Sequence, residues 1–160
     1  MRCIGLIVLC ATSLIASLQC SKVDPPNGHI ILTVTYPEAV VENGSISWIQ
    51  VPANGAEARL YDKDAICLGY KDAMLNIVKI GDHYVTSEYL VVSNEKGEIL
   101  FKDIPSGEYF LIVFARQLYK YSEKYIEVTG GDTLKLEKDF TASLTFFEDL
   151  EPWDYEMPTN

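Results

Sequence analysis

The chain has 160 residues and carries 23 acidic against 13 basic side chains, so its formal net charge at pH 7 is −10. This excess of acid repels phosphate backbones, and no basic cluster is present to hold an anionic membrane surface. Composition therefore excludes nucleic acid as a partner. About 140 residues follow the N-terminal signal described next, which is the usual size of a single domain.

Residues 1–19 have the layout of an export signal, with Arg2 ahead of a long apolar run. The run is too short for a comfortable transmembrane helix, which needs about 20 apolar residues. Its end at Cys20 resembles the lipobox of bacterial lipoproteins, in which the cysteine is diacylated. The pattern departs from the usual one at Leu18, one place late, and at the bulky Gln19. We expect a cell-envelope protein, at the outer membrane, held by lipid on Cys20; plain secretion and an uncleaved anchor are the alternatives.

Cysteine usage agrees with this interpretation. Cys3 and Cys10 would leave with the signal, so acylation of Cys20 leaves Cys67 alone. One cysteine cannot form an intramolecular disulfide, and without nearby histidine or cysteine it cannot form a tetrahedral metal site. We expect Cys67 to be a small buried apolar residue rather than a reactive thiol. The polar, proline-containing residues 20–28 predict a short tether between lipid and fold.

Short segments rich in Val, Ile, Tyr, Phe and Thr, separated by Gly, Pro and Asn, predict β-strands along the rest of the chain. Pro37 is expected to end the first strand, and Gly-Gly-Asp at 130–132 to form a tight hairpin between the last two. Residues 142–147 predict a further edge strand. The other expected strands cover 29–36, 45–51, 56–61, 84–93, 98–102, 108–116, 122–129 and 133–140. Their number and spacing predict an all-β fold, an antiparallel β-sandwich of about seven to nine strands.

These expectations divide the mature chain into a sandwich domain over 29–147 and an acidic tail over 148–160. The tail is expected to be mobile unless Trp153 docks on the domain. Residues 62–83 are ambiguous, because their apolar residues recur at helical spacing and fit a strand equally well. We expect irregular structure there with one short strand.

Asparagine, glycine, proline and aromatic residues recur in a set order in one part of the chain, at Asn94, Gly97, Ile99, Phe101, Ile104, Pro105, Gly107 and Tyr109. This order resembles the signature of carboxypeptidase-regulatory-like domains, which are prealbumin-like (transthyretin-like) sandwiches close to collagen-adhesin B-type repeats. Further matches are Gly55, Ala56, Ala58 and Leu60 upstream, and Tyr121, Tyr125, Ile126, Val128 and Gly131 downstream. The resemblance implies the fold and says almost nothing about function. It places Phe101 and Tyr109 in the core, with Gly97 and Gly107 at turns that bulkier residues resist.

No set of residues predicts catalysis. The best-known enzymes of this fold hydrolyse 5-hydroxyisourate with two histidines, an arginine and a C-terminal Tyr-Arg-Gly-Ser, whereas this chain offers only His29 and His83 and ends differently. Both histidines are expected at exposed turns or strand edges. Asp62 and Asp64 are expected to be solvated charges, and their segment lacks the glycine and the twelfth-position acid of a calcium loop. No catalytic residue, metal site or cofactor is expected.

Aromatic residues supply the functional hint. Tyr119, Tyr121 and Trp153 are candidate contacts that could stack on a sugar or anchor a protein partner. In the alternative interpretation, Tyr121 and Tyr125 pack within the sandwich and Tyr119 lies in a loop. We expect a non-enzymatic, lipid-anchored binding or accessory module with a protein or carbohydrate partner. A structural subunit of a surface assembly and a hydrolase using carboxylates or His83 are the alternatives.

Overall fold

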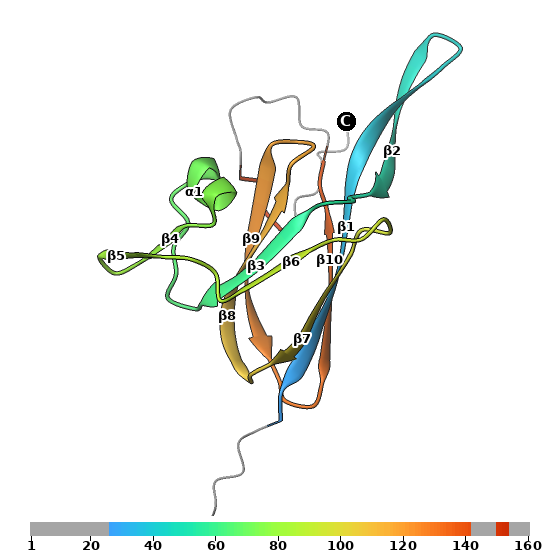
Figure 1. Cartoon of the computed structure of the whole chain (residues 1–160). Coiled ribbons are helices and arrows are strands. Elements are labelled where there is room, and N and C mark those ends of the chain that lie inside the picture. Colours follow the sequence, from blue (N-terminus) through green and yellow to red (C-terminus); the bar gives the residue numbers. More distant parts are fainter. Residues whose placement is uncertain (1–25, 142–149, 154–160) are drawn as a thin grey trace, which may run out of the picture.

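The computed structural model describes residues 26–141 and 150–153. Two stacked β-sheets form the body of the protein, and a small third ladder lies beside them (Figure 1). Sheet A consists of β10 (Thr133–Asp139), β1 (Gly28–Glu42), β2 (Ser45–Pro52) and β7 (Glu98–Ile104). Sheet B consists of β6 (Tyr89–Val92), β3 (Glu57–Asp62), β8 (Gly107–Ala115) and β9 (Lys120–Val128). The predicted all-β sandwich is confirmed.

The main core lies between the two sheets. Alternate residues of β1, from Ile30 to Val34, pack in it with Leu60 of β3 and Leu111 of β8. β8 is the central strand of sheet B, between β3 and β9, and its other face is also buried, at Phe110 for example. Burial on both faces explains why this segment is apolar without alternation.

The predicted hairpin at 130–132 is wrong. β9 pairs with β8, whereas β10 pairs in parallel with β1, so this segment crosses from sheet B to sheet A. The crossing brings Gly130 so close to Pro26 that a Cβ would lie 2.1 Å from the Pro26 carbonyl oxygen. β10 takes this place because Leu134 and Leu136, beside Ile30 and Leu32, extend the main core.

The expectation that Pro37 ends the first strand is also wrong, since β1 continues to Glu42. The amide of Phe140 donates to the Thr35 carbonyl at 3.0 Å, so odd-numbered residues of β1 face β10. The backbone nitrogen of Pro37 points to the same side as that of Thr35. Asp139, the partner of Thr35, is the last β10 residue in the ladder, so no β10 residue lies opposite Pro37. No ladder hydrogen bond needs its missing N–H, and proline is therefore tolerated at this edge.

The second half of β1 and most of β2 form a hairpin that extends beyond the sandwich (Figure 1). We call residues 37–50 the arm. Its tip is the two-residue turn Asn43-Gly44, with φ of 51° and 80°. Both positive values belong to a type I′ turn, whose twist matches that of the paired strands.

Residues 63–88 form an insert that covers part of the outer face of sheet B. It contains α1 (Tyr70–Leu75) and the ladder of β4 (Val78–Ile80) with β5 (His83–Val85). Ala73 and Val78 of the insert pack on Phe110 and Phe114 in a second buried cluster. The ambiguous segment thus contains both a helix and strands. The single strand expected over 84–93 is divided into β5 and β6, because its first part pairs within the insert and its second with β3.

Of the four residues that the resemblance places in the core or at turns, three occupy such places and Gly107 does not. Phe101 and Tyr109 are buried, and the Tyr109 hydroxyl donates to the Pro105 carbonyl at 2.9 Å. Gly97 has φ +74°, and a Cβ there would lie 2.3 Å from the Val34 carbonyl oxygen. At Gly107, by contrast, φ is not positive and a Cβ would meet only the Tyr109 ring at 3.8 Å, so no special turn geometry requires glycine there.

Residues 150–153 dock across one edge of the sandwich. Leu150 forms a parallel bridge with Tyr121 of β9, and the Ser122 hydroxyl donates to the Glu151 carbonyl at 2.7 Å. Trp153 packs against the main core. For residues 150–153, the alternative in which Trp153 docks on the domain replaces the expectation of a mobile tail. The edge strand expected at 142–147 and residues 148, 149 and 154–160 lie outside the described residues.

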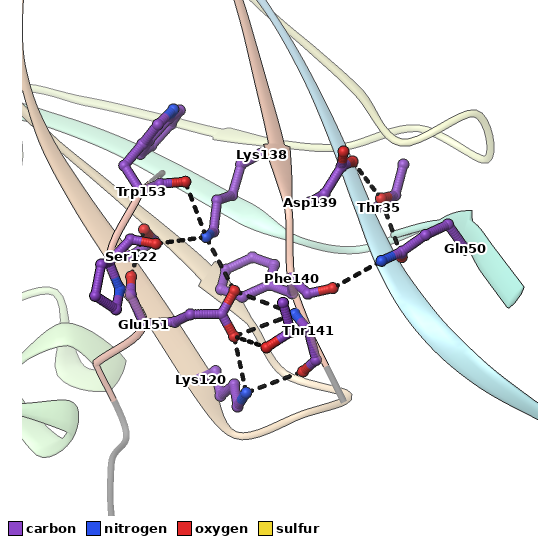
Figure 2. A network of polar contacts seen from close by, with 11 residues as sticks. Thr35, Gln50, Lys120, Ser122, Lys138, Asp139, Phe140, Thr141, Glu151 and Trp153 are labelled. Atoms are coloured by element: carbon purple, nitrogen blue, oxygen red, sulfur yellow. Dashed lines mark hydrogen bonds and ion pairs between the residues drawn. The ribbon is translucent and has the colours of Figure 1, made fainter. Parts of the chain in front are cut away.

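A buried ionic cluster holds this docked segment (Figure 2). The Glu151 carboxylate accepts from Lys120 Nζ at 2.8 Å, Lys138 Nζ at 3.0 Å and the Thr141 amide at 3.1 Å. The Lys138 side chain is fully buried, with its ammonium 5.0 Å from the centre of the Phe140 ring. Burial alone would raise the pKa of Glu151, but the hydrogen bonds from both lysines and Thr141 lower it below its usual value. We call Lys120, Lys138, Thr141 and Glu151 the tail clasp.

Candidate functional site

An aromatic depression lies where α1 meets the turn between β8 and β9. It has a volume of about 230 Å³ and is lined by Tyr70, Met74, Phe114, Arg116 and Tyr119. We call it the Tyr119 notch. The helix of the insert supplies its first two residues, and sheet B with the following turn supplies the other three. The notch therefore exists only because the insert docks on sheet B.

The aromatic rings of the notch form a staggered row. The ring centres of Tyr70 and Phe114 are 5.4 Å apart, and those of Tyr70 and Tyr119 are 6.4 Å apart. These distances lie in the usual range for tilted aromatic pairs. Phe114 is buried, whereas Tyr119 is 71% exposed, so the row leads from the core to the surface.

Backbone conformation presents Tyr119 to solvent. Its φ is +53°, which is rare for a bulky residue. The turn imposes this value: the amide of Leu118 donates to the Ala115 carbonyl at 3.2 Å, and that of Tyr119 to the Arg116 carbonyl at 3.3 Å. Residues in such sparsely populated conformations cluster at binding sites and active sites, where the surrounding structure maintains them.

A buried carboxylate positions the cation of the notch. Arg116 Nε donates to Glu57 Oε1 at 2.8 Å, and one of its terminal nitrogens reaches the same oxygen. Glu57 is held in turn by the buried Arg59, which also donates to the carbonyls of Ala73 and Met74 at the end of α1. The Arg116 side chain remains 65% exposed. The notch thus combines a stacking surface with a fixed, solvent-accessible guanidinium.

This arrangement suits the binding of a ring more than chemistry on it. Tyrosine offers an apolar ring face and a hydroxyl that can donate and accept, and guanidinium offers donors only. The notch is smaller than the roughly 300–1,000 Å³ typical of pockets for drug-sized ligands, and it is shallow and open. Its size would admit a single ring.

The candidate binding residues from the sequence are not brought together. Tyr119 lies in the notch, but Tyr121 is 4% exposed and packs in the second buried cluster, so its expected role as a surface contact is wrong. The alternation of β9 turns Tyr121 under the insert. Trp153 lines a separate depression, where Lys124 Nζ lies 5.2 Å from its ring centre. Tyr125, expected to pack in the alternative interpretation, is largely exposed although its ring lies 5.0 Å from that of Phe110.

Sequence reasoning missed Tyr70, Met74 and Arg116. Tyr70 and Met74 lie four residues apart on one face of α1, but the ambiguous insert hid this helix. Arg116 directly follows the most apolar strand of the chain and is the first residue of the turn between β8 and β9. A single charged residue directly after an apolar strand was the signal that could have identified Arg116 as a site residue.

The residues weighed for chemistry lie apart. His29 Nδ1 accepts from the Asp103 amide at 3.2 Å, and His83 is exposed on β5, opposite Ile80. Asp62 accepts from the Asp64 amide at 2.9 Å in a local turn. Within residues 26–141 and 150–153, no three His, Cys, Asp or Glu side chains converge in a way that could hold a metal ion.

Cys67 is half-buried beside Gly69, and burial raises the pKa of its thiol. A raised pKa favours the unreactive thiol form at neutral pH. Across the described part of the chain, no helix is long and apolar enough to cross a membrane.

The solved structures that resemble this chain include a pilin and a candidate carbohydrate-binding protein. A minor pilin of the gram-positive pathogen Streptococcus agalactiae aligns with a TM-score of 0.44 and 12% identity over 87% of this chain. A candidate carbohydrate-binding protein of Pseudomonas aeruginosa aligns with a TM-score of 0.40 and 14% identity, over 73% of this chain and 90% of its own length. The chain spans 50% of the pilin's length. No family model and no curated protein sequence matches the chain.

Proposed function

We propose that this protein is a lipid-anchored, non-enzymatic binding module of the cell envelope, with a prealbumin-like sandwich that presents the Tyr119 notch to a carbohydrate. The observation that carries the proposal is the row of aromatic rings ending in the exposed, backbone-strained Tyr119, beside the guanidinium of Arg116. One ring of a glycan would stack on the tyrosines, and its hydroxyl or acidic groups would accept from Arg116.

The position of the notch relative to the tether supports this proposal. The first residue of β1, Gly28, pairs with Ile104, and β8 begins three residues later. β8 then rises by eight residues, roughly 27 Å, to Ala115 beside the notch. The turn between β8 and β9, which lines the notch, therefore lies at the end of the sandwich opposite to the start of β1 (Figure 1). An anchor at Cys20 would direct it away from the bilayer.

Replacing Tyr119 by alanine is expected to weaken glycan binding by about tenfold, which is about 1.4 kcal/mol. The change removes the exposed stacking ring without touching either buried cluster. Binding is measured by calorimetry against a panel of purified envelope polysaccharides. Tyr125→Ala is the matched control, because Tyr125 is a tyrosine of similar exposure in a different depression. Equal binding by the two variants, or no polysaccharide bound by the unmodified chain, would contradict a glycan site at the notch.

Replacing Cys20 by serine is expected to move the protein from the membrane fraction to the soluble fraction. A serine hydroxyl cannot form the thioether that carries the diacylglycerol, and two acyl chains are needed for stable anchoring. Fractionation of cells expressing the full chain, with mass spectrometry of the mature N-terminus, measures both location and lipid. A C20S chain that stays with membranes, or an unmodified chain whose N-terminus carries no lipid, argues for one of the other export routes.

A further inference from the structure

The arm carries apolar side chains that nothing in the described part of the chain covers. Val41, Ile46, Trp48 and Ile49 are each about half exposed or more. Val41 lies opposite Ile46, and Ala39 lies opposite Trp48. One face of the arm is therefore apolar from the turn towards its base. Such an exposed apolar surface on an otherwise acidic chain indicates an interaction site.

β2 is also an open edge. The backbone groups of the odd-numbered residues of β2 bond to β1. The Ala53 amide, one residue beyond β2 in the same ladder, shows this because it donates to the Val34 carbonyl at 2.9 Å. The N–H and C=O groups of Ile46, Trp48 and Gln50 point to the other side, where residues 26–141 and 150–153 add no further strand to sheet A. Pro52 lacks an N–H and limits the edge that can pair. No residue of β2 is charged, so the edge lacks the usual protection against pairing.

We propose that β2 pairs in antiparallel fashion with β2 of a second copy of this chain, about a two-fold axis at Trp48. The register follows from the open edge, because only outward-facing backbone groups can bond across it. Trp48 then lies opposite the partner's Trp48, and Ile46 opposite the partner's Gln50. The two arms become one four-stranded sheet with a continuous apolar face. This inference does not depend on the glycan site.

Charge directs a second copy to this edge rather than to another surface of the chain. The chain has a net charge of −10, so most surfaces of two copies repel each other, whereas β2 has no charged residue. The acidic residues of the arm, Glu38 and Glu42, lie on β1, away from this edge. In the dimer the two β1 strands are three strand spacings apart, roughly 14 Å, which exceeds the Debye length of about 8 Å at physiological ionic strength. Repulsion between these carboxylates is therefore largely screened.

The pairing also fixes where the N-terminal ends of the two copies lie. Ala39, opposite Trp48, is eleven residues beyond Gly28, or roughly 36 Å along β1. Antiparallel β2 strands direct the two N-terminal ends away from each other. The dimer therefore joins copies that approach arm to arm, with each tether at the far end.

Single cysteines test this register in the full chain, purified from membranes in detergent, with Cys67→Ser in every variant. Trp48→Cys is expected to form a disulfide dimer in high yield under mild oxidation, because facing hydrogen-bonded residues have Cα atoms about 5.5 Å apart, within disulfide range. Ser47→Cys and Ile49→Cys are the matched controls on the same strand. Each alone should crosslink weakly, and a mixture of the two should crosslink well, because Ser47 lies opposite the partner's Ile49.

Light scattering on the chain without added cysteines measures the dimer independently. Gln50→Lys is expected to shift it to monomer by placing a charge within the paired edge, and circular dichroism checks that this variant keeps its fold. Two results would overturn the proposal. One is crosslinking of W48C no stronger than that of S47C or I49C. The other is a monomer at every concentration tested, which would leave the edge to a strand from a different protein.

Discussion

Replacing Glu151 by glutamine is expected to lower the free energy of unfolding by about 3 kcal/mol. The substitution leaves the ammonium groups of Lys120 and Lys138 buried without their counter-charge, and breaking a buried ion pair typically costs about 3–5 kcal/mol. We expect the lower end of that range, because residues 150–153 can undock and expose both lysines to water. Urea unfolding followed by circular dichroism measures the change.

The same carboxylate makes stability depend on pH. The pKa of Glu151 is lower in the folded protein than its ordinary value of 4.5. The stabilisation is therefore fully present above about pH 4.5 and is lost as pH falls through the lower folded value. The unmodified chain should lose stability in that acidic window, and E151Q should lack this component of the loss.

Glu137→Gln is the matched control for Glu151. Glu137 is an exposed acid on β10, next to the buried Lys138 in sequence, and its replacement should change stability by less than about 0.5 kcal/mol. If E151Q and E137Q unfold at the same urea concentration, the tail clasp does not stabilise the fold.

Replacing Arg59 by methionine is expected to release the insert from sheet B and to lower stability by about 3–5 kcal/mol. The guanidinium is buried, donates to the Ala73 and Met74 carbonyls at the end of α1, and pairs with Glu57. Methionine fills similar volume but satisfies none of these acceptors. Buried polar groups left without a partner carry the full cost of their desolvation.

Hydrogen exchange separates this local effect from global unfolding. Amides of the insert that are hydrogen-bonded in the folded protein, such as Ile66 and Lys79, should exchange faster in R59M while those of β8 stay protected. Glycan binding at the notch should fall with them, because α1 supplies Tyr70 and Met74. Lys63→Met is the control, since the ion pair of Lys63 with Glu108 is exposed and worth at most about 1 kcal/mol. Insert amides as protected in R59M as in K63M would show that Arg59 does not hold the insert.

Strands that alternate in polarity between clear turn residues were predictable from the sequence. The segments expected at 45–51, 108–116 and 133–140 match β2, β8 and β10 within a residue or two. The failures at Pro37 and at 130–132 have one cause. Whether a proline or a glycine pair ends a strand or forms a hairpin depends on which strand lies beside it, and no local pattern records the neighbour.

The candidate site was predictable only in part, and Tyr119 and Tyr121 show why. Both lie in the same short aromatic stretch, yet one is exposed at the notch and the other is buried beneath the insert. Composition identifies aromatic residues at a sheet end but does not say which of them another segment covers. Tyr70, which shares the notch with Tyr119, comes from that covering segment, 49 positions earlier in the chain.

The amino-acid sequence by itself determined an all-β sandwich and the segments that form most of its strands, because alternation of polarity and turn residues act over a few neighbouring positions. Only the tertiary structure decided that β10 lies parallel to β1, that the arm extends past the sandwich, that the insert covers sheet B and that Glu151 binds two buried lysines. Each of these depends on segments far apart in the chain meeting to bury apolar area or to pair charges, and such meetings are selected by the free energy of the whole fold.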